Sequence, residues 1–221
     1  MFRLKLIIIF IGGMVAFLGF EEYKVSMDST EEPMAIELAA LEENTEVDNN
    51  HLKVENYMAL YPYSVYEYQT KKGETGEPGN NTKVNHTYYP IISQSHPYIN
   101  QIAELGNRYE DLSLVPDEEW PTVQNFSVLI KTKSFKTIGS IPDKYEIKTD
   151  IQGLIINKIE ELDSEEKQLV KESFPTVSMN NLLILEEGRK PSSIFKSFGM
   201  MGGGAVLSIL GIGMFFMGRG D

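Results

Sequence analysis

The sequence predicts an α+β protein: a β-rich soluble domain, either a small open barrel or a sheet with two short helices, between N- and C-terminal transmembrane helices. Three observations support this fold class. Residues 197–217 hold no charge and would span about 31 Å as a helix, which is the thickness of a bilayer's hydrocarbon core. A second apolar run, residues 4–20, is interrupted only by Lys5. Between the two runs, apolar and aromatic residues alternate as they do in strands.

The expected organisation has five segments. They are a transmembrane helix at 1–20 that acts as an uncleaved signal anchor, an acidic lead-in at 21–50, a soluble α+β domain at 51–186, a hinge at 187–196 and a transmembrane helix at 197–217. A cleaved secretory signal is the alternative for the first segment. Against it, no small-x-small cleavage site precedes Glu21, and the apolar run is long for a signal core.

Charge is concentrated in the middle of the chain. The formal net charge is −12, and of the 32 acidic residues only Asp221 lies outside residues 21–193. A strongly acidic body repels phosphates, so no nucleic-acid partner is expected and the body should stand off anionic headgroups. Two spans place both termini on one side of the membrane. Because the chain starts with Arg3 and Lys5, we expect cytoplasmic termini and an extracytoplasmic domain.

Small residues spaced four apart indicate where the membrane helices pack. Such residues allow two helix backbones to approach closely in lipid. They would join the two spans of one chain or, alternatively, neighbouring subunits of a homo-oligomer. Apart from Lys5 at the edge of the first run, neither apolar span carries an ionisable residue, which argues against a proton relay. The predicted packing residues are Gly12, Ala16, Gly199, Gly203, Gly204 and Ser208.

The body is expected to begin with a strand or a helical turn at 34–41 and an exposed loop at 42–50. A β-hairpin is predicted at 63–92, because alternating aromatic segments flank a tip rich in Gly, Pro and Asn. The predicted helices begin after a Ser95 cap and after an Asp163 cap, the latter ending before Pro175. Short strands are expected at 126–132, 135–138 and 182–185, and a strand or helix start at 151–159.

No stretch specifies a reaction or a cofactor. Cysteine is absent, which excludes thiolate ligands and a cysteine nucleophile. The spacing of His51, His86 and His96 matches no metal motif. Paired acids such as Glu186 and Glu187 are read as solvated charge rather than as an acid and base pair. No metal site and no catalytic residue is therefore predicted.

Tyrosines crowd the predicted hairpin and suggest a binding surface. Tyrosine offers a large amphipathic contact area that is enriched at protein interfaces. The aromatic hairpin would bind another membrane or envelope protein, or a glycan. The alternative is that the rings simply alternate between the core and an ordinary exposed face. The candidate partner-binding residues are Tyr63, Tyr66, Tyr68, Tyr88 and Tyr89.

Five segments of the chain stand out together: NNH at 49–51, YYPII at 88–92, LIKTK at 129–133, IQGLIIN at 151–157 and LEEGRKP at 185–191. In these segments the chain resembles a group of uncharacterised bacterial two-span membrane proteins. The resemblance covers most of the body and both spans, and it implies an architecture without an activity. In layout alone the chain is also similar to GIDE-type membrane-anchored ubiquitin ligases. Those proteins need a RING domain, whose cysteine ligands this sequence lacks.

The function that these observations predict is a membrane-anchored binding or assembly module whose first partner is the lipid bilayer. The rival prediction is a membrane-bound hydrolase-type enzyme, with catalytic groups gathered from distant positions by the fold.

Overall fold

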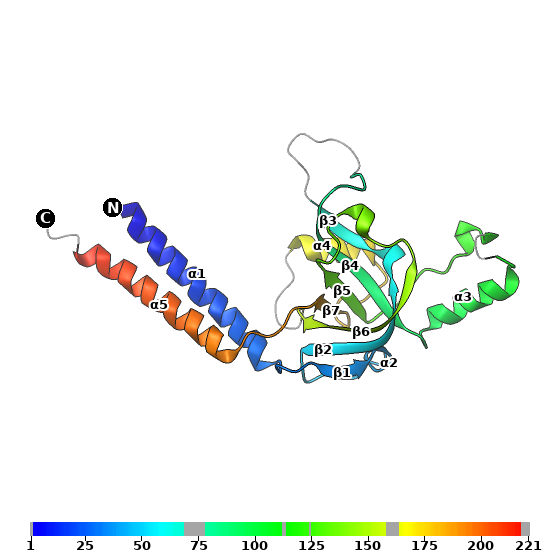
Figure 1. Cartoon of the computed structure of the whole chain (residues 1–221), viewed down its shortest axis with the longest axis horizontal. Helices are drawn as coiled ribbons and strands as arrows, with labels where there is room; N and C mark the ends of the chain where they lie inside the picture. Colours follow the sequence, from blue (N-terminus) through cyan, green and yellow to red (C-terminus); the bar gives the residue numbers. More distant parts are fainter. Residues whose placement is uncertain (1, 69–77, 112–113, 124, 158–163, 218–221) are drawn as a thin grey trace. The chain divides into compact units, whose positions relative to one another are not determined.

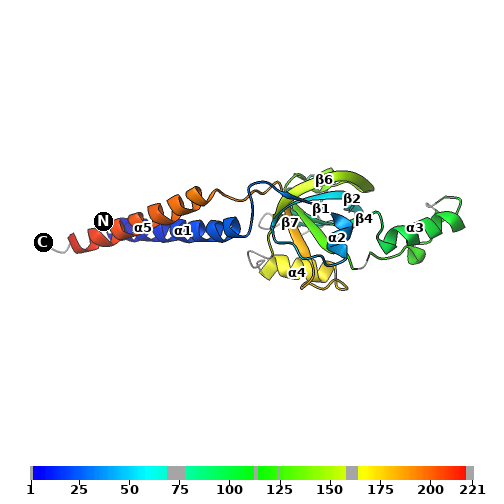
Figure 2. The same cartoon turned by 90° about the horizontal axis from the view of Figure 1, so that it is seen from below.

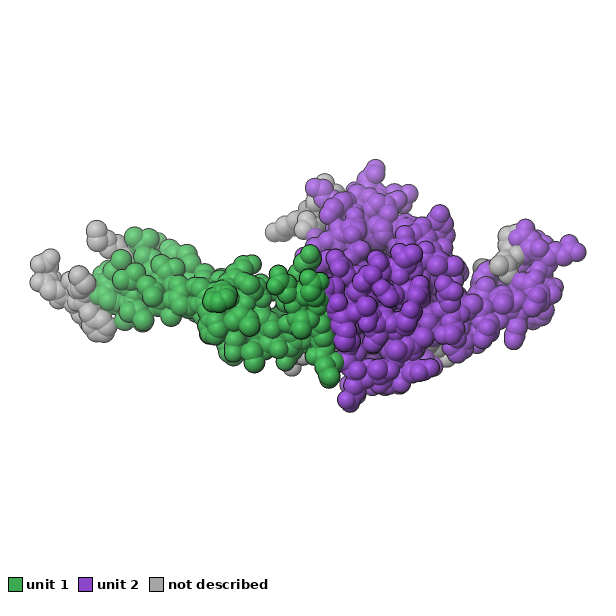
Figure 3. All heavy atoms as spheres, turned by 60° about the horizontal axis from the view of Figure 1, so that its bottom comes forward, with its two compact units in different colours: residues 1–32, 48–51, 190–221 green, residues 33–47, 52–189 purple. Residues whose placement is uncertain are grey.

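The computed structural model describes residues 2–68, 78–111, 114–123, 125–157 and 164–217. The chain divides into two compact units, coloured separately in Figure 3. Unit 1 holds Met1–Glu32, Asp48–His51 and Lys190–Asp221. Unit 2 holds Pro33–Val47 and Leu52–Arg189. The predicted α+β class is confirmed: unit 2 is a small mixed β-barrel, and the long apolar helices of unit 1 pack together.

Unit 1 is an antiparallel pair of helices, α1 (Phe2–Met27) and α5 (Ile194–Met217), seen side by side in Figures 1 and 2. Within them, two segments are long and apolar enough to cross a membrane, Arg3–Met27 and Ile194–Met214. α1 thus continues past the predicted end at residue 20, because nothing in its last turns breaks a helix. At one end of the pair, the Lys5 ammonium donates to the Met214 carbonyl.

The other end of the pair is tied by a short polar segment of unit 1. The Ser26 hydroxyl donates to the carbonyl of Ser192 over 2.5 Å. The Asn49 carboxamide accepts from the Thr30 amide over 3.1 Å, and His51 Nδ1 bonds to the Thr30 carbonyl over 2.9 Å. The prediction of an exposed loop at 42–50 is wrong at its end, because Asn49 and Asn50 are buried there.

The described residues of unit 2 form seven strands in the order β1-β2-β6-β7-β5-β4-β3, with an additional pairing of β2 with β4 that closes five of them into a barrel. The β4–β5 and β6–β7 pairs are antiparallel and the β5–β7 pair is parallel. The strands are β1 (Met34–Glu37), β2 (His51–Leu60), β3 (Val65–Tyr68), β4 (Val84–Ser93), β5 (Val128–Thr132), β6 (Tyr145–Ile155) and β7 (Leu183–Glu187).

Short helices complete unit 2. The 34–41 segment contains both predicted states, because β1 is followed at once by α2, and β1 then pairs in parallel with β2. The two predicted short helices are α3 and α4. The helices are α2 (Leu38–Glu42), α3 (Pro97–Arg108), α4 (Ser164–Ser173) and the 3-10 turns η1 (Tyr61–Tyr63), η3 (Asp117–Glu119) and η4 (Ile138–Ser140).

The barrel wall is apolar on both sides. One core cluster draws on all five barrel strands and fills the interior, with residues such as Tyr57, Tyr89 and Ile130. A second cluster joins the outer face of β4, β5 and β7 to α4 through Val170. This double burial explains why every residue of β5 is buried, a pattern typical of a strand covered on both faces.

Gly153 lets β6 approach β7 closely. A Cβ atom at this position would lie 2.1 Å from the carbonyl oxygen of Glu186. Since a carbonyl of the β7 backbone has little freedom to move, only glycine fits where the two strands pair. β7 then ends in a turn in which Gly188 has φ +74°, a conformation that glycine adopts without strain.

The predicted hairpin is confirmed, with β3 antiparallel to β4, while three local predictions differ. The strand expected at 135–138 is a single bridge from Lys83 to Thr137 that leads into η4, because the Thr137 and Ser140 hydroxyls cap that turn. α3 is capped by His96 and not by Ser95. The strand expected from 151 begins earlier, at Tyr145. Asp163, the other predicted cap, and residues 158–159 lie outside the described residues.

Candidate binding pocket between the hairpin and α4

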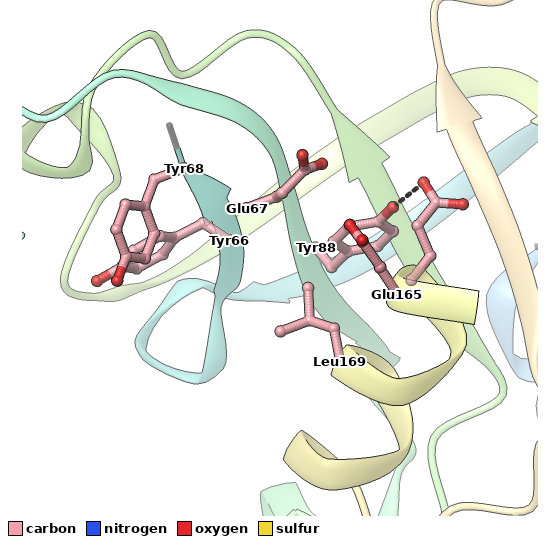
Figure 4. A pocket seen from close by; sticks show the side chains of 7 residues that line it. Tyr66, Glu67, Tyr68, Tyr88, Glu165 and Leu169 are labelled. Atoms are coloured by element: carbon pink, nitrogen blue, oxygen red, sulfur yellow. Dashed lines mark hydrogen bonds between the residues drawn. The ribbon is translucent and has the colours of Figure 1, made fainter. Parts of the chain in front are cut away.

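A pocket of about 280 Å³ lies where the β3–β4 hairpin meets α4 (Figure 4). Its lining combines three tyrosines, three carboxylates and one apolar side chain. The lining residues are Tyr66, Glu67, Tyr68, Tyr88, Glu165, Glu166 and Leu169.

The hairpin supplies the aromatic side of the pocket. Val65 lies opposite Tyr88, and Glu67 lies opposite His86. The register then shifts between Glu67 and Tyr68, and such a bulge re-aims side chains at the end of a strand. The rings of Tyr66 and Tyr68 lie 6.2 Å apart. Tyr68 is 37% exposed, so this end of the pocket is open to solvent.

The first turn of α4 supplies the acidic side. The apolar residues of this helix anchor it to the barrel wall, with Val170 buried and Leu169 packed against the same cluster. That anchorage places Glu165 beside Tyr88 (Figure 4), and it brings Glu166 within hydrogen-bond distance of the Tyr88 hydroxyl. Carboxylates in the first turn of a helix are favoured by the partial positive charge of its N-terminus.

Glu166 is held by a buried polar group at the base of the pocket. It accepts a hydrogen bond from the Tyr88 hydroxyl over 2.5 Å and forms an ion pair with Lys131 of β5. The Lys131 residue is 8% exposed, and its ammonium lies 5.8 Å from the centroid of the Tyr88 ring. A buried ammonium requires such a partner, because desolvation of an unpaired charge is expensive.

Glu67 has polar partners of its own at the rim. The Asn85 amide donates to one carboxylate oxygen over 2.8 Å. The other oxygen lies 3.5 Å from His86 Nδ1, a contact that carries charge only when the imidazole is protonated. Among the described residues that line the pocket, none is a cation. This described part of the lining therefore presents carboxylates and aromatic rings to whatever enters it.

The structure separates the five predicted tyrosines. Tyr66, Tyr68 and Tyr88 line the pocket. Tyr89 is 3% exposed inside the barrel, where its ring lies 4.7 Å from that of Tyr61, and burial raises its pKa. Tyr63 belongs to a different cluster, with its hydroxyl 3.2 Å from that of Tyr98. The predicted alternative, in which some rings are core, therefore describes Tyr89 and also Tyr88, which is 0% exposed and belongs to the second core cluster although it lines the pocket.

Sequence reasoning missed the acidic side of the pocket. The sequence predicts a helix here, but nothing in it connects Glu165, Glu166 or Leu169 to the hairpin. The hydrogen-bond partners Tyr88 and Glu166 are 78 residues apart in the sequence. The spacing of α4 residues indicated a buried face, but no local pattern names the strand that covers it.

The three histidines occupy separate places. His51 begins β2, His86 lies beside Glu67, and His96 caps α3. Among the described residues, no three His, Asp or Glu side chains converge as ligands for a metal ion. The pKa of His96 lies below its ordinary value, because burial disfavours the charged ring more than the negative charge of Glu42 favours it.

The histidine that caps α3 lies near a cluster of serines and a glutamate, the residue types of a hydrolase. Here the Ser93 hydroxyl donates to Glu42 and also lies 3.0 Å from the Ser95 hydroxyl. His96 Nδ1 instead accepts from the Tyr98 backbone amide over 3.2 Å. A serine nucleophile needs the imidazole as its base. These bonds therefore connect α2, β4 and α3 rather than activating Ser93.

The predicted helix-packing residues also divide into two groups. A Cβ atom at Gly12 would lie 2.6 Å from the Ser208 amide nitrogen, and one at Gly204 would lie 2.4 Å from the Ala16 amide nitrogen. These four residues lie in the contact between α1 and α5. At Gly199 and Gly203 a Cβ atom would meet nothing within 4 Å. An oligomeric contact through the second group stays a prediction.

Two further glycines, which the sequence reasoning did not select, belong to the same helix contact. A Cβ atom at Gly19 would lie 2.7 Å from the Met201 amide nitrogen, and one at Gly211 would lie 2.6 Å from Ile9 Cγ1. The close approach of α1 and α5 therefore extends along most of the pair.

Comparison of the chain with family models, curated proteins and solved structures found no match.

Proposed function

We propose that this protein is a membrane-anchored binding module that uses the pocket between β3, β4 and α4 to engage a partner at the membrane surface. α1 and α5 anchor it as two spans, with both termini in the cytoplasm and the barrel on the outer side. The observation that carries the proposal is the pocket itself, because it combines exposed aromatic surface with a rigid, hydrogen-bonded base.

The anchoring part rests on the surface of the helix pair. Large apolar side chains project from both helices, with Phe10 73% and Ile209 66% exposed. Contiguous apolar surface of this kind marks a contact with lipid or protein. Backbone groups within a helix are satisfied internally, which is the condition for crossing a bilayer. The basic residues Arg3 and Lys5 support cytoplasmic termini.

The binding part is tested by photo-crosslinking in intact membranes. A photoreactive phenylalanine analogue replaces Tyr68 at the open end of the pocket, and the same analogue replaces Tyr109, at the end of α3, as the matched control. We expect a discrete crosslinked partner from position 68, which mass spectrometry identifies as a protein, a second copy of the chain or a glycoconjugate. Position 109 should not give this product.

A second variant connects the crosslink to the pocket. Replacing Tyr66 by Ser removes the neighbouring ring while leaving the buried Tyr88–Glu166 base intact, so it should strongly reduce the crosslink from position 68. If positions 68 and 109 give the same products, or if the product from position 68 is unchanged in Tyr66→Ser, the pocket is not the binding surface.

A further inference from the structure

We propose that the group which enters this pocket is a cationic side chain, lysine or arginine, from a protein partner. This inference deepens the proposed function and rests on it, because it assigns the ligand class of the same pocket. Three features of the described residues support it: the balance of charge, the aromatic faces and the size of the pocket.

The charge balance favours a cation. Three carboxylates line the pocket, and the Lys131 ammonium is paired with Glu166. Lys131 therefore offsets one of the three carboxylates. Glu67 accepts a hydrogen bond from the neutral amide of Asn85 and lies 3.5 Å from His86 Nδ1, a contact that carries charge only when the imidazole is protonated. An anionic ligand such as a phosphate would meet like charge on two sides. The net charge of −12 adds a long-range attraction for basic partners.

The tyrosine rings provide a complementary surface. The face of an aromatic ring carries a negative quadrupole, and an ammonium or guanidinium within about 6 Å of the ring centroid is attracted to it. The protein already shows this arrangement internally, because Lys131 lies 5.8 Å from the Tyr88 ring centroid while paired with Glu166. Tyr66 and Tyr68 also line the pocket, so an incoming cation would meet rings as well as carboxylates. In Figure 4 these two rings lie together on one side of β3, and Glu67 projects to the other.

The size of the pocket limits the ligand to one side chain. At about 280 Å³, it lies just below the range of about 300–1,000 Å³ that is typical of small-molecule sites. One long side chain fits such a space, with its methylenes against Leu169 and its charged end near Glu165. A glycan is the competing ligand, since carboxylates and rings also bind sugars, and the experiment includes it.

The test measures direct binding to the full-length protein in lipid nanodiscs, with 13C-labelled tyrosine rings observed by NMR. The probes are end-capped pentapeptides with a central lysine or norleucine between glycines, and chitotriose as the glycan. Norleucine keeps the methylene chain and lacks the ammonium. We expect the lysine peptide to shift the Tyr66 and Tyr68 resonances. Its affinity should be at least about fivefold higher than that of the norleucine peptide, as ring and carboxylate contacts of this strength imply.

Variants localise the effect. Glu165→Gln should weaken binding of the lysine peptide about threefold, and Glu67→Gln provides a second variant if the first perturbs the tyrosine spectrum without ligand. Glu104→Gln, which removes the same charge from an exposed position of α3, should change binding by less than about 1.5-fold. Raising the salt concentration should weaken binding in the wild type, because exposed charges are screened.

Several outcomes would overturn the inference. Equal binding of the lysine and norleucine peptides would show that the site recognises the apolar methylene chain and not the positive charge. Shifts caused by chitotriose alone would make it a glycan site. An equal effect of Glu165→Gln and Glu104→Gln would show that binding depends on the net charge of the protein and not on this pocket. The two proposals remain separable: lysine binding without a crosslinked partner at position 68 contradicts only the proposed function, whereas a crosslinked partner without lysine binding contradicts only the ligand class.

Discussion

The Tyr88 hydroxyl donates to the Glu166 carboxylate over 2.5 Å, and this bond joins β4 of the barrel to the first turn of α4. Because Glu166 also pairs with the buried Lys131, one carboxylate connects β4, β5 and α4. The same bond forms the base of the pocket. Its geometry therefore matters both for the stability of unit 2 and for the shape of the candidate binding site.

We expect Glu166→Ala to destabilise the protein by about 3 kcal/mol. The substitution leaves the Lys131 ammonium buried without its anion, and breaking one partner of a buried pair typically costs about 3–5 kcal/mol. Denaturant unfolding of the full chain in detergent micelles measures the free energy. Tyr88→Phe removes only the hydroxyl and should cost about 1.5 kcal/mol.

The companion variant replaces both charges. Lys131→Met combined with Glu166→Leu should recover most of the lost stability, because neither substituted side chain leaves an unpaired charge. A double variant as unstable as Glu166→Ala would contradict the explanation by buried charge.

We expect Gly204→Leu to destabilise the helix pair, whereas its neighbour Gly203→Leu should not. The close approach of α1 leaves no room for a Cβ at Gly204, but Gly203 is open. Overpacking of this kind costs about 2 kcal/mol. Thermal unfolding in detergent, followed by circular dichroism, compares the two variants, which carry the same added side chain on the same helix. Equal melting temperatures would place the contact elsewhere.

We expect acid to destabilise the wild type partly through His96. Its pKa in the folded protein lies below the ordinary value of 6.5, mainly because burial disfavours the charged ring. The unfolded chain therefore binds the proton more readily, so the contribution of His96 is present above pH 6.5 and declines as the pH falls through that value.

His96→Asn is the matching variant, because asparagine still caps a helix and does not titrate. Unfolding free energies of both proteins at a series of pH values from 8 to 5 measure the difference, and subtraction removes the contributions of groups that do not interact with His96. The difference should change in favour of the variant below about pH 6.5. A difference that is constant with pH would show that His96 does not titrate differently on folding.

The expected topology is tested with single cysteines, which the natural chain lacks. Glu104→Cys on the exposed side of α3 should react with a membrane-impermeant maleimide in intact cells. Asp221→Cys should react only after the membrane is permeabilised. The reverse pattern would place the barrel in the cytoplasm and the termini outside.

The sequence predicted correctly those elements that depend on interactions between residues close together in the chain. The hairpin, α3 and α4 follow from patterns within about 30 residues, and all three appear in the structure. The errors at 135–138 and at Ser95 arose where local propensity competes with side-chain hydrogen bonds. There, the hydroxyls of Thr137 and Ser140 and the imidazole of His96 decide the backbone conformation.

The sequence predicted the aromatic side of the candidate site but not its acidic side. Crowded tyrosines drew attention to the hairpin, and Tyr66, Tyr68 and Tyr88 do line the pocket. Tyr89 follows Tyr88 directly and alternation along β4 turns its ring into the barrel interior. The sequence reasoning did not assign the two positions to opposite faces, since it did not establish which face of the strand is interior.

The sequence by itself determined two apolar ends, an acidic middle and the presence of strands and short helices, because composition and periodicity are local properties of the chain. Only the tertiary structure decided that β2 pairs with β4 to close the barrel, that Gly12 and Gly204 meet between α1 and α5, and that Glu166 reaches Tyr88. These contacts join residues far apart in the chain, and the packing of the whole chain selects them among many pairings that local preference allows equally.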